Sequence, residues 1–155
     1  MQMTFSMNTI FKATAKKLPE GLQVETTARN FKILLDEPED LGGTNKGLNP
    51  VEAVLSALGA CQTICAYAFA GAMHIDLKDF YVELEGDLDP DGFMGLNKEV
   101  RNGFSEIRFT MHMTTDASQK KAEKLADFIE SRCPVGDCLE NPVKLVRTGV
   151  VVHQE

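Results

Sequence analysis

The sequence has no surplus of basic residues and no cluster of them that could follow a nucleic acid. Its 155 residues include 16 Lys and Arg against 23 Asp and Glu, which gives a formal net charge of −7 at pH 7. The basic residues are scattered, apart from short pairs such as Lys16-Lys17 and Lys120-Lys121. Because an acidic chain without a basic stripe has little to neutralise phosphates, we expect neither nucleic acid nor an anionic lipid surface as a partner.

A secretion signal and a convincing membrane span are also missing. Residues 1–17 lack an apolar core and a small-residue cleavage site. Residues 53–73 carry no charge and are long enough to span a membrane, but they are rich in alanine and have no flanking cluster of Lys or Arg. We therefore expect a cytoplasmic protein without a membrane segment. In a reducing compartment, cysteines are more often reactive thiols or metal ligands than disulfides.

The length and composition indicate one globular domain covering residues 1–155. The chain is 43% hydrophobic and 25% charged, and it contains neither a low-complexity tract nor an internal repeat. Alternation of apolar and polar residues predicts six strands, at residues 9–17, 22–28, 31–35, 77–87, 104–115 and 144–153. Helical spacing and caps predict a long helix to about residue 74, a second helix ending near residue 132 and a short third one from Pro134. This order is typical of an α+β fold.

The long helix has a clear start and an unusual composition. Asn49 can act as its N-cap, Pro50 suits the first helical position, and Glu52 completes a capping box. A helix without a polar face must be covered on all sides, and one small domain has little material for that. We therefore predict a homodimer in which two such helices pack together, wrapped by sheets.

Four cysteines fall into two clusters, Cys61 with Cys65 and Cys133 with Cys138. Cys61 and Cys65 are four residues apart on the expected helix, so they share one face, but their parallel Cβ directions disfavour a disulfide between them. Cys133 precedes Pro134 and can cap the short helix, whose dipole favours a thiolate. Three interpretations stay open: four ordinary buried residues, a four-cysteine zinc site, or a thiol pair with one cysteine from each cluster.

Three segments carry a family resemblance. They are Asp36-Glu37-Pro38 with Gly42-Gly43, Asn49-Pro50-Val51-Glu52 with Ala57-Leu58-Gly59-Ala60-Cys61, and Arg132-Cys133-Pro134-Val135-Gly136-Asp137. On these motifs the chain resembles the OsmC/Ohr family, the osmotically inducible protein C and organic hydroperoxide resistance group, from about Phe31 to Val152. The resemblance implies an α+β fold whose antiparallel sheets pack around a long central helix in an intertwined homodimer.

The resemblance also implies a chemistry, because characterised family members are thiol-dependent peroxidases of organic hydroperoxides. By motif match, Cys61 takes the peroxidatic role and Cys133 the resolving role, in a mostly apolar pocket at the dimer interface. An external thiol then reduces the disulfide, without a metal or other cofactor. Cys65 and Cys138 have no counterpart in the motifs, so we interpret each as a core residue, with the role of a substitute resolving thiol left open.

Two departures from the family pattern leave open whether the protein is an enzyme. Family peroxidases carry a glutamate directly after Asn-Pro, where this chain has Val51, and Glu52 points about 100° away around the helix. Family peroxidases also use an arginine on an early strand to hold the thiolate and the peroxide. No arginine stands at that place in this chain, and Lys16, Lys17 and Arg29 are the candidates to replace it. The structural interpretations are a capping role for Glu52 and exposed strand charges for the three basic residues.

We therefore expect an OsmC-like branch without the usual helper Glu and Arg. Its leading function is thiol-based reduction of an organic hydroperoxide or related electrophile by Cys61 and Cys133. The alternative is a non-catalytic protein that binds a small apolar or thiol-reactive ligand in the same pocket.

Overall fold

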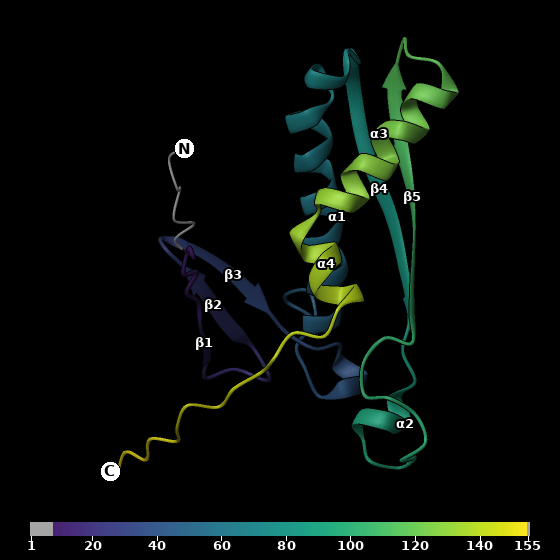
Figure 1. Ribbon diagram of the computed structural model, residues 1–155. Coiled ribbons are helices and arrows are strands. Elements are labelled where there is room, and N and C mark those ends of the chain that lie inside the picture. The colour runs from purple at the N-terminus through teal and green to yellow at the C-terminus, as the bar shows by residue number, and fades with distance from the viewer. Residues whose placement is uncertain (1–7, 155) are drawn as a thin grey trace. The chain divides into compact units, whose positions relative to one another are not determined.

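The computed structural model describes residues 8–154. The chain divides into two compact units, Met1–Val54 and Leu55–Glu155, which are described in turn. Figure 1 shows the α+β character predicted from the sequence, with antiparallel strands in each unit and helices in the second.

The first unit contains a three-stranded antiparallel sheet in the order β1-β2-β3, formed by Thr14–Lys17, Val24–Ala28 and Phe31–Leu35. In the central strand, Val24 pairs with Lys17 on one side and with Leu35 on the other. The prediction of a strand over residues 9–17 was wrong for its first part, because β1 begins at Thr14. Strand β2 ends at Ala28, one residue after Thr27, the partner of Thr14, so it offers no pairing to residues 9–12.

A buried carboxylate organises the glycine-rich loop that follows β3. Asp36 is 2% exposed and accepts hydrogen bonds from the Thr44 hydroxyl (2.6 Å) and from the backbone N–H groups of Glu37, Thr44 and Lys46 at 2.9 to 3.1 Å. These bonds, led by the one from the Thr44 hydroxyl, lower the pKa of Asp36 to about 2 despite its burial. A Cβ added at Gly43 would lie 1.8 Å from the Glu37 carbonyl oxygen, so this loop is close-packed.

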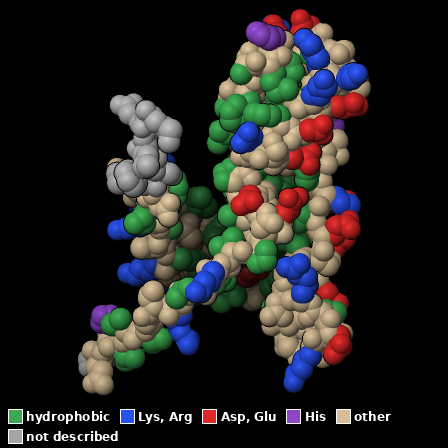
Figure 2. All heavy atoms as spheres, in the orientation of Figure 1, with side chains coloured by type: hydrophobic (Ala, Val, Ile, Leu, Met, Phe, Trp, Pro, Cys, Tyr) green, Lys and Arg blue, Asp and Glu red, His purple; other side chains and the backbone are tan. Residues whose placement is uncertain are grey.

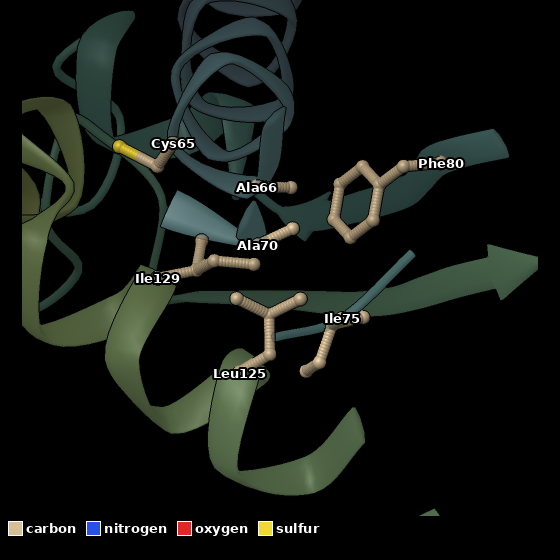
Figure 3. Packing of buried hydrophobic residues seen from close by; sticks show 7 residues of the cluster. All are labelled: Cys65, Ala66, Ala70, Ile75, Phe80, Leu125 and Ile129. Carbon is tan, nitrogen blue, oxygen red and sulfur yellow. The ribbon is translucent and has the colours of Figure 1, made fainter. Parts of the chain in front are cut away.

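The second unit contains most of helix α1 (Pro50–Phe69), the short helix η2 (Gly71–Met73), the antiparallel strands β4 (Leu77–Asp87) and β5 (Glu106–Thr115), and the helices α2 (Pro90–Phe93), α3 (Gln119–Arg132) and α4 (Pro134–Glu140). Helices α1 and α3 both contribute to a core against the strand pair (Figure 3). From α3, Leu125 and Ile129 are fully buried; they pack with Ala66 and Ala70 of the α1 region and with Phe80 of β4. The ring of Phe69, the last residue of α1, makes an edge-to-face contact at 5.1 Å with the ring of Phe128 on α3.

Helix α1 ends earlier than residue 74, at Phe69. A turn at Ala70 and the short helix η2 follow, and His74 terminates η2 in the left-handed conformation, with φ of 54°. Glycine at position 71 disfavours continuation of a helix, which accounts for the early end.

The predicted C-terminal strand is not formed in the described chain, because residues 142–154 have no secondary structure. Their apolar side chains are exposed; Leu145 is 93% and Val151 is 79% exposed. The alternating pattern favours a strand, but a strand also needs a partner for its backbone hydrogen bonds.

One face of α1 is buried and the other is exposed in the single chain. The buried side chains within the helix are those of Leu58, Gln62, Cys65 and Ala66, whereas Ile64 is 70% and Tyr67 is 51% exposed. Figure 2 shows hydrophobic side chains on the surface of this unit. By length and composition alone α1 is apolar enough to cross a membrane, a test that core helices of globular proteins also pass.

Candidate functional site

The first cysteine cluster lies on α1 at the border between its buried and exposed faces. Cys61 is half-buried and packs at the edge of the core, while Cys65, one turn later, is buried within it. The Cys65 sulfur lies 4.0 Å from the carbonyl oxygen of Arg132, the last residue of α3. Helix α1 therefore presents these two thiols toward the end of α3.

Cys133 lies at the junction of α3 and α4 and is 2% exposed. Its backbone is extended, with φ of −74° and ψ of 107°, because Pro134 disfavours a helical conformation in the preceding residue. The Cys133 sulfur caps α4 by accepting a hydrogen bond from the Gly136 N–H group at 3.3 Å. The predicted capping position of Cys133 is confirmed.

The fold brings three of the four cysteines together. The Cys65 sulfur lies 4.0 Å from the carbonyl oxygen of Arg132, the residue before Cys133, and Cys61 lies one turn before Cys65 on α1. All three cysteines are free thiols. Burial first, and then the interaction with Cys61, raise the pKa of Cys133 to about 11, against the opposing effect of the Gly136 N–H group. Burial and Cys61 also raise the pKa of Cys65. Cys61 is the most accessible thiol of the three.

A polar residue that sequence reasoning did not single out lies beside this cluster. Gln62 is 2% exposed, and its side-chain oxygen Oε1 accepts no hydrogen bond from residues 8–154. The signal for its burial was present in the sequence, since Gln62 is four residues from both Leu58 and Ala66 on the buried face of α1. Its lack of a hydrogen-bond partner could not be predicted, because it depends on which side chains distant in sequence surround it.

Cys65 and Cys138 were both interpreted as core residues, and the two predictions have different outcomes. Cys65 is a core residue, as interpreted from the sequence, and it is also a neighbour of Cys61. The interpretation of Cys138 as a core residue was wrong, because Cys138 is exposed on α4. At the end of α4, the side-chain amide of Asn141 donates a hydrogen bond to the Asp137 carboxylate.

The three supporting candidates of the first unit all make local contacts. Glu52 forms the expected capping box: its carboxylate accepts from the Asn49 N–H group and its own N–H donates to the Asn49 side chain, both at 2.8 Å. The Lys17 ammonium donates to the carbonyl oxygen of Leu18. Arg29, with a left-handed φ of 56°, places its guanidinium 4.8 Å from the centre of the Phe31 ring. A role for these residues in catalysis stays a prediction.

Away from the thiol cluster, β4 and β5 carry three interacting side chains, those of Tyr81, Glu83 and His112. The His112 ring stacks on Tyr81 at 4.3 Å, and its Nε2 lies 3.0 Å from the Glu83 carboxylate. This group borders a shallow groove of about 670 Å³ between β5 and α3, and neither Cys61 nor Cys133 lines that groove. Within residues 8–154, no three His, Cys, Asp or Glu side chains are arranged to hold a metal ion.

The family assignment follows from comparison with known proteins. The model of the OsmC-like protein family matches residues 43–146, which include both Cys61 and Cys133. This match covers more than half of the chain, so the protein belongs to the OsmC-like family, as the motifs indicated.

Individual relatives are similar over most of their length. The chain is 28% identical over 126 residues to a protein named hydroperoxide reductase from Mycoplasma genitalium, covering 79% of this chain and 82% of that protein. It is 27% identical over 132 residues to the protein of the same name from Mycoplasma pneumoniae, covering 83% and 86%. The crystal structure of an OsmC-like protein from Mycoplasma pneumoniae shares its fold, with a TM-score of 0.77, 24% identity, and coverage of 88% of this chain and 91% of that one.

Proposed function

We propose that this protein reduces organic hydroperoxides or related electrophiles with the thiols of Cys61 and Cys133. One observation carries the proposal: the start of α4, where Cys133 lies, packs against the stretch of α1 that holds Cys61. The Cys65 sulfur is 4.0 Å from the carbonyl oxygen of Arg132, and a Cβ added at Gly136 would lie within 4 Å of both the Cys133 sulfur and Leu58. The relatives named hydroperoxide reductase support the substrate class. The half-buried position of Cys61 supports its role as the residue that meets the peroxide, since its two thiol neighbours are buried.

In the first step, the Cys61 thiolate attacks the terminal oxygen of the hydroperoxide. The O–O bond breaks, a sulfenic acid forms on Cys61, and the remaining alkoxide takes up a proton and leaves as an alcohol. Cys61 is thereby oxidised and the peroxide reduced by two electrons.

In the second step, Cys133 attacks the sulfur of the Cys61 sulfenic acid. A disulfide forms, and the sulfenic oxygen leaves as water. While Cys61 is reduced, the raised pKa of Cys133 keeps this residue a neutral thiol at neutral pH. The Gly136 N–H group lowers the pKa of Cys133 against this rise, so it stabilises the Cys133 thiolate that attacks the sulfenic sulfur.

In the third step, an external dithiol reduces the Cys61–Cys133 disulfide by two thiol–disulfide exchanges and is itself oxidised to a disulfide. A cytoplasmic location would supply such thiols continuously, which favours that compartment over an oxidising one.

The functional form in this proposal is a homodimer, with the thiol site at its interface. The exposed Ile64 and Tyr67 on α1 would lose water contact against a second copy, and burial of such apolar surface favours association. Light scattering tests the dimer: we expect twice the chain mass of 17.1 kDa, and a monomer at micromolar concentration would contradict it.

A turnover assay tests the function itself. The purified protein is mixed with cumene hydroperoxide and dithiothreitol, and loss of hydroperoxide is followed against the uncatalysed reaction. We expect many hydroperoxide molecules to be consumed per protein chain, with one dithiol oxidised for each. A ligand that raises the melting temperature while hydroperoxide loss stays at the uncatalysed rate would contradict the proposal and favour the non-catalytic binding protein.

A further inference from the structure

The buried amide of Gln62 is the most unusual polar group near the thiols. Its Oε1 atom is enclosed by the protein and accepts no hydrogen bond from residues 8–154. An unpaired buried amide oxygen destabilises a fold, and an apolar side chain of similar volume would fill the same space without this cost. Such a group in a native protein calls for an explanation in terms of strain, a bound molecule or chemistry.

The neighbours of Gln62 on the buried face of α1 lie at the thiol cluster. Helical side chains lean toward the N-terminus of their helix, so Gln62 extends toward Leu58, one turn earlier. Leu58 borders the same space as Cys133: a Cβ added at Gly136 would lie 3.8 Å from Leu58 Cδ1 and 3.6 Å from the Cys133 sulfur. Cys65, three residues after Gln62 on the same buried face of α1, lies 4.0 Å from the carbonyl oxygen of Arg132, the residue before Cys133.

The donors already at the site have other partners. The Gly136 N–H group donates to the Cys133 sulfur, and the Cys65 sulfur lies 4.0 Å from the Arg132 carbonyl oxygen. The proposed reaction brings one new O–H donor to Cys61. This is the terminal hydroxyl of the hydroperoxide, which keeps its hydrogen when it is transferred to sulfur as the sulfenic hydroxyl.

We propose that Gln62 binds the substrate by accepting a hydrogen bond from this transferred hydroxyl, after its side-chain torsions turn Oε1 toward Cys61. The same bond then holds the hydroxyl on the sulfenic acid. This inference rests on the proposed function and extends it. In this chain Val51 stands where family peroxidases carry a glutamate. Gln62 supplies an uncharged hydrogen-bond acceptor that helps to position the substrate.

The test compares wild type with Gln62→Met, which removes the acceptor at nearly unchanged volume. We expect the second-order rate of Cys61 oxidation by cumene hydroperoxide to fall about tenfold or more. Alkylation of Cys61 by iodoacetamide, which has no transferable hydroxyl, is expected to change less than twofold. The melting temperature is expected to stay equal or rise, because the unpaired oxygen is gone. A purely structural role would lower the melting temperature and alter both reactions alike.

Two further variants keep the test decisive. Gln62→Leu replaces Gln62→Met if that variant does not fold, and Gln119→Met on the exposed surface of α3 is the matched control, expected to react like wild type. Equal hydroperoxide rates in wild type and the Gln62 variants would overturn this inference and leave the proposed function standing. A wild-type Cys61 that is inert to cumene hydroperoxide would overturn both.

Discussion

Replacing Cys61 by serine is expected to lower the turnover of cumene hydroperoxide about a thousandfold or more, to the uncatalysed rate. A serine hydroxyl is almost fully protonated at neutral pH and cannot pass through a sulfenic acid, so neither chemical step remains. Because the side chain is nearly isosteric and Cys61 is only half-buried, the melting temperature should change little. The measurement is the dithiothreitol-dependent loss of hydroperoxide described above, with thermal unfolding alongside it.

Cys138→Ser is the matched control for this variant. Cys138 is exposed on α4, outside the three-thiol cluster, and we expect its replacement to leave turnover within about twofold of wild type. A Cys61→Ser protein that kept a tenth of the wild-type rate would contradict the account. If Cys138→Ser were the inactive variant instead, the exposed thiol would be the reacting one.

Replacing Cys133 by serine is expected to separate the two chemical steps. The first oxidation of Cys61 should keep a rate within a few-fold of wild type, but the sulfenic acid should then persist and be trapped by dimedone. With excess peroxide it should progress to sulfinic acid, and turnover should fall about tenfold or more as the protein is inactivated. Stopped-flow oxidation and intact-mass spectrometry measure these two effects.

The behaviour of Cys65 is the internal check on the Cys133 variant. Cys65 interacts with Cys61, but both lie on the same continuous helix one turn apart, where their Cβ directions disfavour a disulfide. We therefore expect no rapid Cys61–Cys65 disulfide in Cys133→Ser. Formation of that disulfide at the wild-type rate would show that Cys65 is the resolving residue.

The parts of the site that follow local rules could be predicted from the sequence. Spacing by four residues places Cys61 and Cys65 on one helix face, and Cys-Pro at a helix start places Cys133 at a cap. The capping box of Asn49 and Glu52 is likewise a matter of neighbouring residues, and both of its hydrogen bonds are present. These features depend on backbone geometry within a few residues.

The parts that depend on distant residues could not be predicted in the same way. Cys65 is buried where α1 meets the end of α3, and the approach of Gly136 and Cys133 to Leu58 joins residues far apart in sequence. The alternating pattern of residues 144–153 favoured a strand, yet these residues have no secondary structure in the described chain. The alternating pattern indicates which residues suit a strand. It does not indicate whether a neighbouring strand is available for the backbone hydrogen bonds that a strand requires.

The most direct test of a Cys61–Cys133 dithiol site is peptide mapping after a single oxidation. The reduced wild-type protein is treated with one equivalent of cumene hydroperoxide at pH 7, its remaining thiols are blocked at once, and the digest is analysed by mass spectrometry without reduction. The account predicts one dominant disulfide, between the peptides that carry Cys61 and Cys133, with Cys65 and Cys138 alkylated. Four alkylated cysteines and unconsumed hydroperoxide, or a disulfide that leaves out Cys61, would contradict it.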